Sequence, residues 1–245
     1  MARQRRARHH PGGGMTTGPV PDGRLLVPLY VHPAVDPAAW RAVAAADPSR
    51  ITAVVLNLAD GPGETPDGVF SDAVEELRAA GLPLIGYTDT DYGRRPHAAV
   101  VADILTYRQR HGINGAYLDQ VATHPGALAH YRRLATAARA AGCHTVVFGH
   151  GDHPDPGYAE VGLADLLVTF EGDWTAYRSM TQPLWTGRHA ASRFCHLVYD
   201  VPADAAEDAT ALIAARRAGV GCAVPGAGDN PWCTLPYGLA AAELT

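Results

Sequence analysis

A repeating pattern constrains the fold of this chain more than any other feature of its sequence. Short apolar segments alternate with polar loops and alanine-rich helical segments from about residue 24 onward, with no break in composition. Eight apolar segments have the length of buried strands. They are Leu25–Val31, Ile51–Leu58, Leu82–Thr88, Gly115–Asp119, His144–Gly149, Ala164–Phe170, Phe194–Val201 and Val220–Val224.

Strands that alternate with helices predict a parallel sheet, and about eight such units predict that this sheet closes into a barrel. We therefore expect an α/β fold, a single (β/α)8 TIM-like barrel spanning residues 24–245. An open doubly wound sheet would also alternate, but it usually needs fewer units and often has a glycine-rich first turn. The first turn here is His32-Pro33, which is not a phosphate cradle.

Helix signals support the same division of the chain. Asp36 followed by Pro37 is an N-cap pattern, and Gly112 follows a helical segment where a C-terminal cap is expected. A final helix is predicted at Leu239–Leu244, and the connection that leads from Glu171 to Arg193 is the least regular part.

The N-terminal segment differs from the rest. Residues 1–23 contain four arginines, a His-His pair and three consecutive glycines, and they predict a disordered tail. No apolar region follows Arg5-Arg6, so we expect no export signal and a cytoplasmic protein. No apolar run is long enough for a membrane span. Four cysteines without C-x-x-C spacing agree with reduced thiols.

The charge distribution argues against a nucleic-acid partner. With the four arginines of residues 1–14 set aside, 16 basic and 25 acidic side chains remain, a formal charge of −9. A domain with this negative charge binds polyanions such as nucleic acid poorly. We expect a small-molecule or oligosaccharide substrate instead.

Polar side chains recur at the ends of the predicted strands. In a barrel these ends converge on one face, where the chemistry of such folds lies. The set is Tyr30, Asn57, Tyr87, Asp119, His150, Glu171, His196 and Asn230. Asp119 and Glu171 are the candidate catalytic pair, because glycosidic cleavage needs one carboxylic acid and one carboxylate. The alternative is that either carboxylate pairs with an arginine or caps a helix.

Other polar and aromatic residues are candidates for substrate binding. Asp89, Asp91 and Tyr92 suit contacts to sugar hydroxyls, or they form an Asx-turn and a helix start balanced by Arg94 and Arg95. Trp174 is a sugar platform or a residue that covers the barrel rim. His196, inside a strand, is more often a packed histidine than an acid–base group.

Metal and cofactor motifs are weak or missing. The segment His150-Gly151-Asp152-His153 contains residue types that bind metal ions. A metal-dependent barrel hydrolase, however, usually carries His-x-His after its first strand, where only His32 is present. No Walker loop or nucleophile elbow occurs. We expect no metal and no cofactor.

With these residues identified, the chain resembles the spherulation-specific family 4 proteins, from about Leu25 to Leu239. Several short segments carry the resemblance together. They are Pro28-Leu29-Tyr30, Asn57 with Gly61-Pro62-Gly63, Gly86-Tyr87 with Thr90-Asp91-Tyr92-Gly93, the Asp119 strand, Phe170-Glu171 and Asn230-Pro231-Trp232. The resemblance implies a barrel related to glycoside hydrolases that cleave α-1,4-linked N-acetylgalactosamine or galactosamine polymers, with Asp119 and Glu171 as the working carboxylates.

The sequence departs from that family at two places. The family typically reads Asp-Glu where this chain has Asp119-Gln120, and Gln120 cannot ionise. The fifth strand typically ends Asn-Pro-Gly, where this chain has Gly149-His150-Gly151. We therefore expect a metal-independent glycoside hydrolase-like barrel acting on an amino sugar or glycoside, with Gln120 shaping the pocket.

Two rival functions remain open at this point. One is an intracellular biosynthetic enzyme of the isomerase, cyclase or lyase type that acts on a small molecule. The other is a non-catalytic glycan-binding barrel that lost its chemistry at Gln120.

Overall fold

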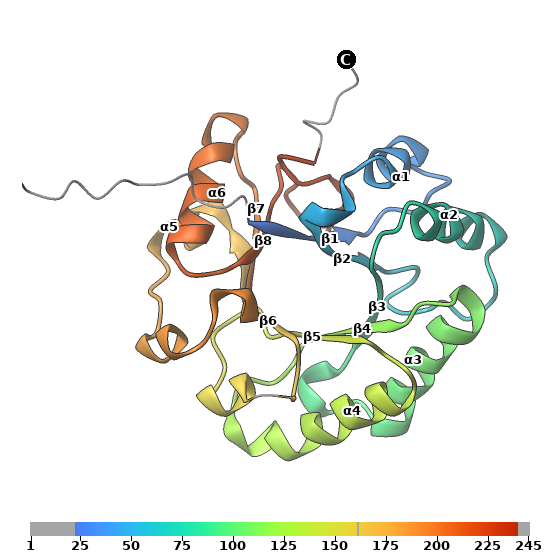
Figure 1. The fold of residues 1–245 in the computed structure, drawn as a ribbon, viewed down its shortest axis with the longest axis horizontal. Coiled ribbons are helices and arrows are strands. Elements are labelled where there is room, and N and C mark those ends of the chain that lie inside the picture. The colour runs from blue at the N-terminus through green and yellow to red at the C-terminus, as the bar shows by residue number, and fades with distance from the viewer. Residues whose placement is uncertain (1–22, 161, 240–245) are drawn as a thin grey trace, which may run out of the picture.

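Eight parallel strands close into a barrel in the computed structural model, which describes residues 23–160 and 162–239 (Figure 1). Each strand pairs with the next in sequence, and the last pairs with the first. The strands are β1 Arg24–Leu29, β2 Ile51–Leu56, β3 Leu84–Asp89, β4 Gly115–Asp119, β5 Thr145–Gly149, β6 Leu166–Asp173, β7 Phe194–Tyr199 and β8 Val220–Ala223. The predicted (β/α)8 barrel is confirmed, with strand bounds close to those expected.

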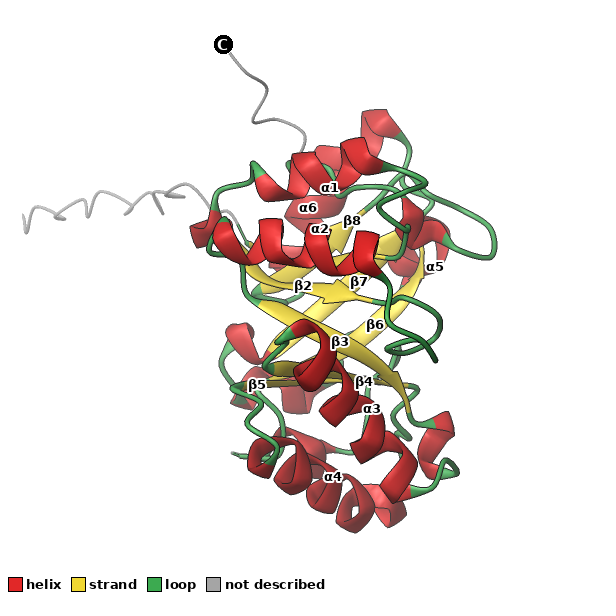
Figure 2. Cartoon of the chain, turned by 90° about the vertical axis from the view of Figure 1, so that its right-hand side faces the viewer, coloured by secondary structure: helices red, strands yellow, loops and turns green. Residues whose placement is uncertain are grey.

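The helices lie outside the barrel wall (Figure 2). In the described part of the chain they are α1 Pro37–Ala44, α2 Gly68–Ala79, α3 His97–His111, α4 Leu128–Ala140, α5 Trp174–Ser179 and α6 Ala206–Ala215. The helical structure in the described part of the connection between β5 and β6 is the short 3₁₀ helix Pro156–Ala159.

Local capping explains where the helices begin and end. The side chain of Asp36 accepts a hydrogen bond from Ala39 N at 2.9 Å, and Pro37 occupies the first turn of α1. Gly112 ends α3 in the left-handed conformation, with φ of 62°. Both features were predicted. Helix α5 was not, although Asp173 caps it by accepting from Ala176 N at 2.8 Å.

Strand residues alternate between two hydrophobic layers. One layer fills the barrel interior, with Val55, Ile85, Tyr117 and Leu197 among its members. The other lies between the strands and the helices, and Leu118 and Phe148 belong to it. The interior is thus a packed core. At the carboxyl end of each strand, the next inward-facing side chain lies at the mouth of the barrel.

Strand β6 breaks this alternation. Its pairing with β7 steps from Val168↔Cys195 to Phe170↔His196, so Thr169 has no partner and forms a β-bulge. Val168 faces the interior, whereas Phe170 packs outside against Tyr177, with ring centroids 4.7 Å apart. Regular alternation from Val168 would direct position 171 outward, but after the bulge it lies beside Leu197 and faces the interior.

Two predicted features lie outside the described residues. These are the tail at 1–22 and the helix predicted beyond residue 239. Within the described ranges, no helix combines the length and the apolar character that a membrane crossing requires.

Candidate active site

A cavity of about 540 Å³ opens at the carboxyl ends of the strands. Residues that follow most of the strands line it, together with the segment after β8. They are Tyr30, Asn57, Leu58, Ala59, Asp60, Tyr87, Asp119, Glu171, Tyr199, Gly228, Asp229, Asn230, Pro231 and Trp232. The structure therefore brings both predicted catalytic carboxylates into one cavity, with four of the predicted binding residues.

Asp119 ends β4 on the inward face, two residues after the buried Tyr117. Its Oδ2 accepts a hydrogen bond of 2.8 Å from the hydroxyl of Tyr87 on β3. Burial raises the pKa of Asp119, while the Tyr87 hydroxyl and the Gln120 backbone N–H oppose that shift by stabilising the carboxylate. The charge of Asp89 raises it further.

Glycine at position 149 leaves room for Asp119. A Cβ added there would lie 2.7 Å from both Asp119 Oδ1 and the Tyr117 hydroxyl, closer than real Cβ contacts allow. The β5 strand thus approaches the carboxylate with backbone only. A side chain at this position would displace Asp119, Tyr117 or both.

Glu171 reaches the cavity through the bulge in β6. Its Oε1 accepts a hydrogen bond of 3.0 Å from the indole N–H of Trp232. Burial raises the pKa of Glu171 to about 7, the charge of Asp119 adds to this rise, and the Trp232 hydrogen bond opposes it. A carboxyl group with such a pKa keeps its proton at weakly acidic pH, as a general acid requires.

The two carboxyl groups differ in their surroundings, and their titrations are coupled because the charge of one acts on the other. Both pKa values are raised by burial. The Tyr87 hydroxyl favours the ionised form of Asp119, whose negative charge in turn keeps the proton on Glu171. Glu171 thus keeps its proton up to about pH 7, and a hydrogen bond favours the ionised form of Asp119. Glycosidic cleavage needs one acid and one carboxylate.

Three other predicted residues support the wall of the cavity. Asn57 Oδ1 accepts from Gly61 N at 3.0 Å, and Asn230 Nδ2 donates to the Tyr30 carbonyl at 2.9 Å. The Tyr30 ring meets the Tyr87 ring edge-on, with centroids 5.6 Å apart. The Asn57 contact stabilises the loop after β2 internally, and the other two join the end of β1 to the segment after β8 and to β3.

Four polar or aromatic residues that line the cavity were not among the predicted site residues: Asp60, Tyr199, Asp229 and Trp232. Tyr199 follows Leu197 at the next inward position of β7, so alternation along that strand could have found it. Trp232 lies on a 3₁₀ helix, Pro231–Cys233, that no strand-end rule locates.

Two predicted histidines do not line the cavity. His196 lies between β7 and α5, fully buried, with Nδ1 2.7 Å from the Tyr177 hydroxyl. His150 packs outside the barrel against Tyr158, and its Nδ1 lies 3.0 Å from the Val121 carbonyl oxygen. Burial lowers the pKa of His150 to about 4 and that of His196 to about 3, so both stay neutral. Strand alternation turns both side chains away from the mouth.

Trp174 also lies outside the cavity. Its ring packs near Tyr177, with centroids 6.3 Å apart, and Arg178 lies over it at 5.8 Å. It is the first residue of α5, and its predicted role in covering the barrel rim stays a prediction. Trp232 is the indole that contacts Glu171 instead.

The loop after β3 follows the turn interpretation of its sequence. Asp89 Oδ1 accepts from Asp91 N at 2.8 Å, which is an Asx-turn, and Asp91 pairs with Arg94. Tyr92 is 53% exposed, with the Arg94 guanidinium 5.7 Å from its ring centroid. None of the three predicted binding residues of this loop lines the cavity.

Gln120 does not line the cavity either. It adopts a positive φ of 50°, and its carbonyl accepts hydrogen bonds from Tyr92 N at 2.8 Å and Thr90 Oγ1 at 2.9 Å. Its backbone thus joins the loops after β3 and β4. The expectation that its side chain shapes this cavity is not met.

No three His, Cys, Asp or Glu side chains gather as a metal site within residues 23–160 and 162–239. His32 has Nε2 3.3 Å from Asp67 Oδ2, and His153 lies beside Asp152. Metal independence remains a prediction.

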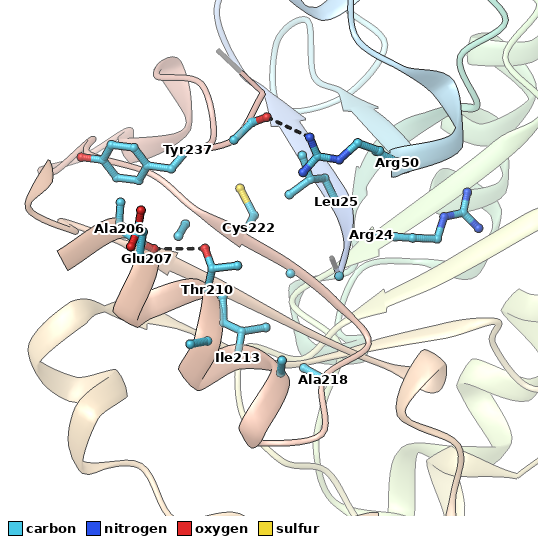
Figure 3. A pocket seen from close by; sticks show the side chains of 16 residues that line it. Arg24, Leu25, Arg50, Ala206, Glu207, Thr210, Ile213, Ala218, Cys222 and Tyr237 are labelled. Carbon is cyan, nitrogen blue, oxygen red and sulfur yellow. Dashed lines mark hydrogen bonds between the residues drawn. The ribbon is translucent and has the colours of Figure 1, made fainter. Parts of the chain in front are cut away.

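A second cavity, of about 530 Å³, lies outside the barrel wall, between α6, β1 and β8 (Figure 3). Its lining is mainly apolar, with Arg24, Arg50, Thr210 and Tyr237 at its edges. Glu207 is its one acidic residue among those described. Because it lacks a carboxylate pair, we assign the candidate active site to the mouth of the barrel.

Comparisons with known proteins agree with this architecture. The model of the family described as "Spherulation-specific family 4" matches residues 24–224. Spherulin-4 of Physarum polycephalum is 32% identical over 152 residues, which are 60% of this chain and 44% of that relative. The matched region thus spans less than half of Spherulin-4.

The fold is also that of a solved structure. Sph3 of Aspergillus clavatus, determined in complex with GalNAc, has a TM-score of 0.76 to this chain. The match covers 90% of this chain and 96% of the Sph3 chain at 23% identity. At that identity the likeness concerns the barrel fold.

Proposed function

This chain belongs to the spherulation-specific family 4, and on that premise we propose that it is a glycoside hydrolase that cleaves a bond to an amino sugar. Glu171 acts as the general acid and Asp119 as the partner carboxylate. The carrying observation is the unequal carboxyl pair in the barrel mouth. Asp119 accepts a hydrogen bond from Tyr87 that favours its ionised form, and Glu171 has its pKa raised to about 7.

Each carboxyl group has a defined part in the reaction. The protonated Glu171 donates its proton to the glycosidic oxygen while the bond from that oxygen to C1 breaks, and the bonding electron pair leaves with the oxygen. Asp119 supplies the negative charge that faces the positive charge developing at C1. It completes the reaction by attacking C1 or by taking a proton from the attacking water.

The lining of the cavity favours a positively charged sugar. Four carboxylate residues line it, and no Lys, Arg or His does so among the described residues. Tyr30, Tyr199 and Trp232 add aromatic surface of the kind that sugars and cations contact. Sph3, which shares the fold, was determined with GalNAc, and this supports a hexosamine as the substrate unit.

Partially deacetylated α-1,4-linked galactosaminogalactan oligosaccharides are the first substrates to test, with products followed by mass spectrometry. We expect the wild type to release shorter oligosaccharides. Glu171→Gln and Asp119→Asn each remove one partner of the pair and should abolish this turnover. Turnover that persists in either variant would refute the assignment.

Gln120→Glu, which restores the residue typical of the family, separates the rival functions. Because Gln120 lies outside the cavity lining, we expect cleavage by the wild type without this change. Cleavage by Gln120→Glu alone would identify a barrel disabled at this position. No cleavage by either protein would direct attention to a small-molecule substrate.

A further inference from the structure

The segment that follows β8 is bound to the first strand of the barrel. Tyr30 N donates to the Trp232 carbonyl at 3.2 Å, and Asn230 Nδ2 donates to the Tyr30 carbonyl at 2.9 Å. Two hydrogen bonds thus join residues from opposite ends of the described chain. They fix the backbone from which the Trp232 side chain reaches the cavity.

The indole of Trp232 is held as firmly as its backbone. The residue is only 6% exposed, and its ring meets Tyr199 edge-on with centroids 5.9 Å apart. From this position Nε1 donates to Glu171 Oε1 at 3.0 Å. A rigid donor therefore contacts one defined oxygen of the carboxyl group.

The chemistry of the indole decides where the carboxyl proton lies. An indole N–H is a donor and never an acceptor, so the oxygen that it contacts must present a lone pair. A proton on Oε1 would compete with the indole for that oxygen, whereas Oε2 is free of this donor. We propose that Trp232 is a positioning residue that assigns the acidic proton of Glu171 to Oε2, an inference that rests on the proposed glycosidase function.

This assignment has a kinetic consequence. Without the indole, the proton distributes over both oxygens and the carboxyl group rotates more freely, so less of the enzyme presents a proton to the leaving oxygen. Because a positioned general acid contributes about 10²–10⁴-fold to rate, we expect Trp232→Phe to lower kcat about 10- to 100-fold. KM should change little, since the loss occurs in the transition state.

The test compares two leaving groups. Wild type and Trp232→Phe are assayed with the shortest oligosaccharide that the wild type cleaves and with its dinitrophenyl glycoside, whose leaving group needs little protonation. We expect the full loss with the oligosaccharide and a change below about threefold with the dinitrophenyl glycoside. The alkaline limb of kcat should also move to higher pH, because the indole lowers the pKa of Glu171.

Trp40→Phe is the matched control. Trp40 is 3% exposed, and its Nε1 donates to the Val31 carbonyl at 2.8 Å, outside the cavity. The Trp40→Phe variant loses the same atoms and one similar hydrogen bond as Trp232→Phe. It should therefore leave kcat for both substrates and the alkaline limb of the pH profile unchanged. An equal loss with both leaving groups in Trp232→Phe, without a shift of the limb, would overturn the proposal.

A direct titration separates this inference from the proposed function. The carboxyl carbon of Glu171 is followed by ¹³C NMR in wild type and in Trp232→Phe, and no substrate is needed. A higher pKa in the variant supports the role of the indole even if no glycoside is cleaved. An unchanged pKa would overturn it even in an active glycosidase.

Discussion

Tyr87 and Asp119 face one another from neighbouring strands, and the tyrosine hydroxyl donates to Asp119 Oδ2 at 2.8 Å. The tyrosine remains a neutral donor, because burial and the charge of Asp119 raise its pKa. On the other carboxyl group, Trp232 donates to Glu171. Each carboxyl group thus has one neutral side-chain donor, and burial together with the charge of Asp119 raises the pKa of Glu171 to about 7.

Tyr87→Phe tests the first of these contacts. Removing the hydroxyl deprives Asp119 of a donor that lowers its pKa, so the acidic limb of kcat/KM should move to higher pH. A hydrogen bond to a charged group contributes about 1.5–3 kcal/mol, which corresponds to a loss of roughly 10- to 100-fold in kcat/KM. Tyr158→Phe, which loses one hydrogen bond to a backbone carbonyl outside the cavity, is the control. An unmoved acidic limb would contradict the role of Tyr87.

Glu171→Gln should change stability as well as activity. The folded protein holds the Glu171 pKa at about 7, above the ordinary value of 4.5. The stabilising effect of the protonated carboxyl group is therefore complete below pH 4.5 and is lost as pH rises through 7. At 1.36 kcal/mol per pKa unit, reduced for partial exposure, the loss is on the order of 2 kcal/mol.

Urea unfolding between pH 4.5 and 8 measures this effect. The inactive Glu171→Gln variant cannot ionise at this position, so it should lose less stability than the wild type across that range. At pH 8 it should be the more stable protein. Parallel pH profiles for the two proteins would show that the Glu171 pKa is not raised by folding.

Gly149→Ala tests the space beside Asp119. The added Cβ would meet Asp119 Oδ1 and the Tyr117 hydroxyl at 2.7 Å, so the carboxylate must move. A displacement of this kind should lower kcat by up to about 100-fold. Gly68→Ala is the control, because its added Cβ meets nothing within 4 Å. Full activity of Gly149→Ala would show that the position of Asp119 is not critical.

Asp60→Asn and Asp229→Asn test the charge of the rim. Both carboxylates are exposed at the cavity, so each should contribute about 0.2–1 kcal/mol to binding of a protonated amino sugar. We expect KM to rise up to about fivefold with unchanged kcat, and added salt should diminish the difference. Asp72→Asn, on the outside of the barrel in α2, changes net charge equally and should have no effect. Fully N-acetylated oligosaccharides should not distinguish the rim variants from wild type.

The barrel itself could be predicted because its signals are local. Apolar strand segments, N-cap residues and terminal glycines appear in the sequence at their own positions. Asp119 was also predictable for a physical reason, since regular alternation from Tyr117 directs it inward. The same rule explains why two predicted binding residues do not line the cavity, because His196 is an outward member of β7 and His150 directly follows the inward-facing Gly149.

Glu171 was chosen by its place after an apolar strand and lies in the cavity, although alternation alone would have turned it outward. The unpaired Thr169, which reverses its direction, has no signature in composition or periodicity. The tryptophans show the same limit. Trp174 is near Glu171 in sequence and packs away from the cavity, whereas Trp232, 61 residues away, donates to it. Contacts of this kind depend on closure of the barrel.

The β-bulge in β6 also affects how homologous genes should be compared. Loss of one codon between Val168 and Glu171 would remove the bulge and restore regular pairing, with the glutamate two positions after Val168 and still facing the interior. A one-residue gap at this place in an alignment is therefore compatible with an intact carboxyl pair. A homologue that keeps both intervening residues but pairs them regularly would instead turn the glutamate toward the helices, although every site residue would remain in the gene.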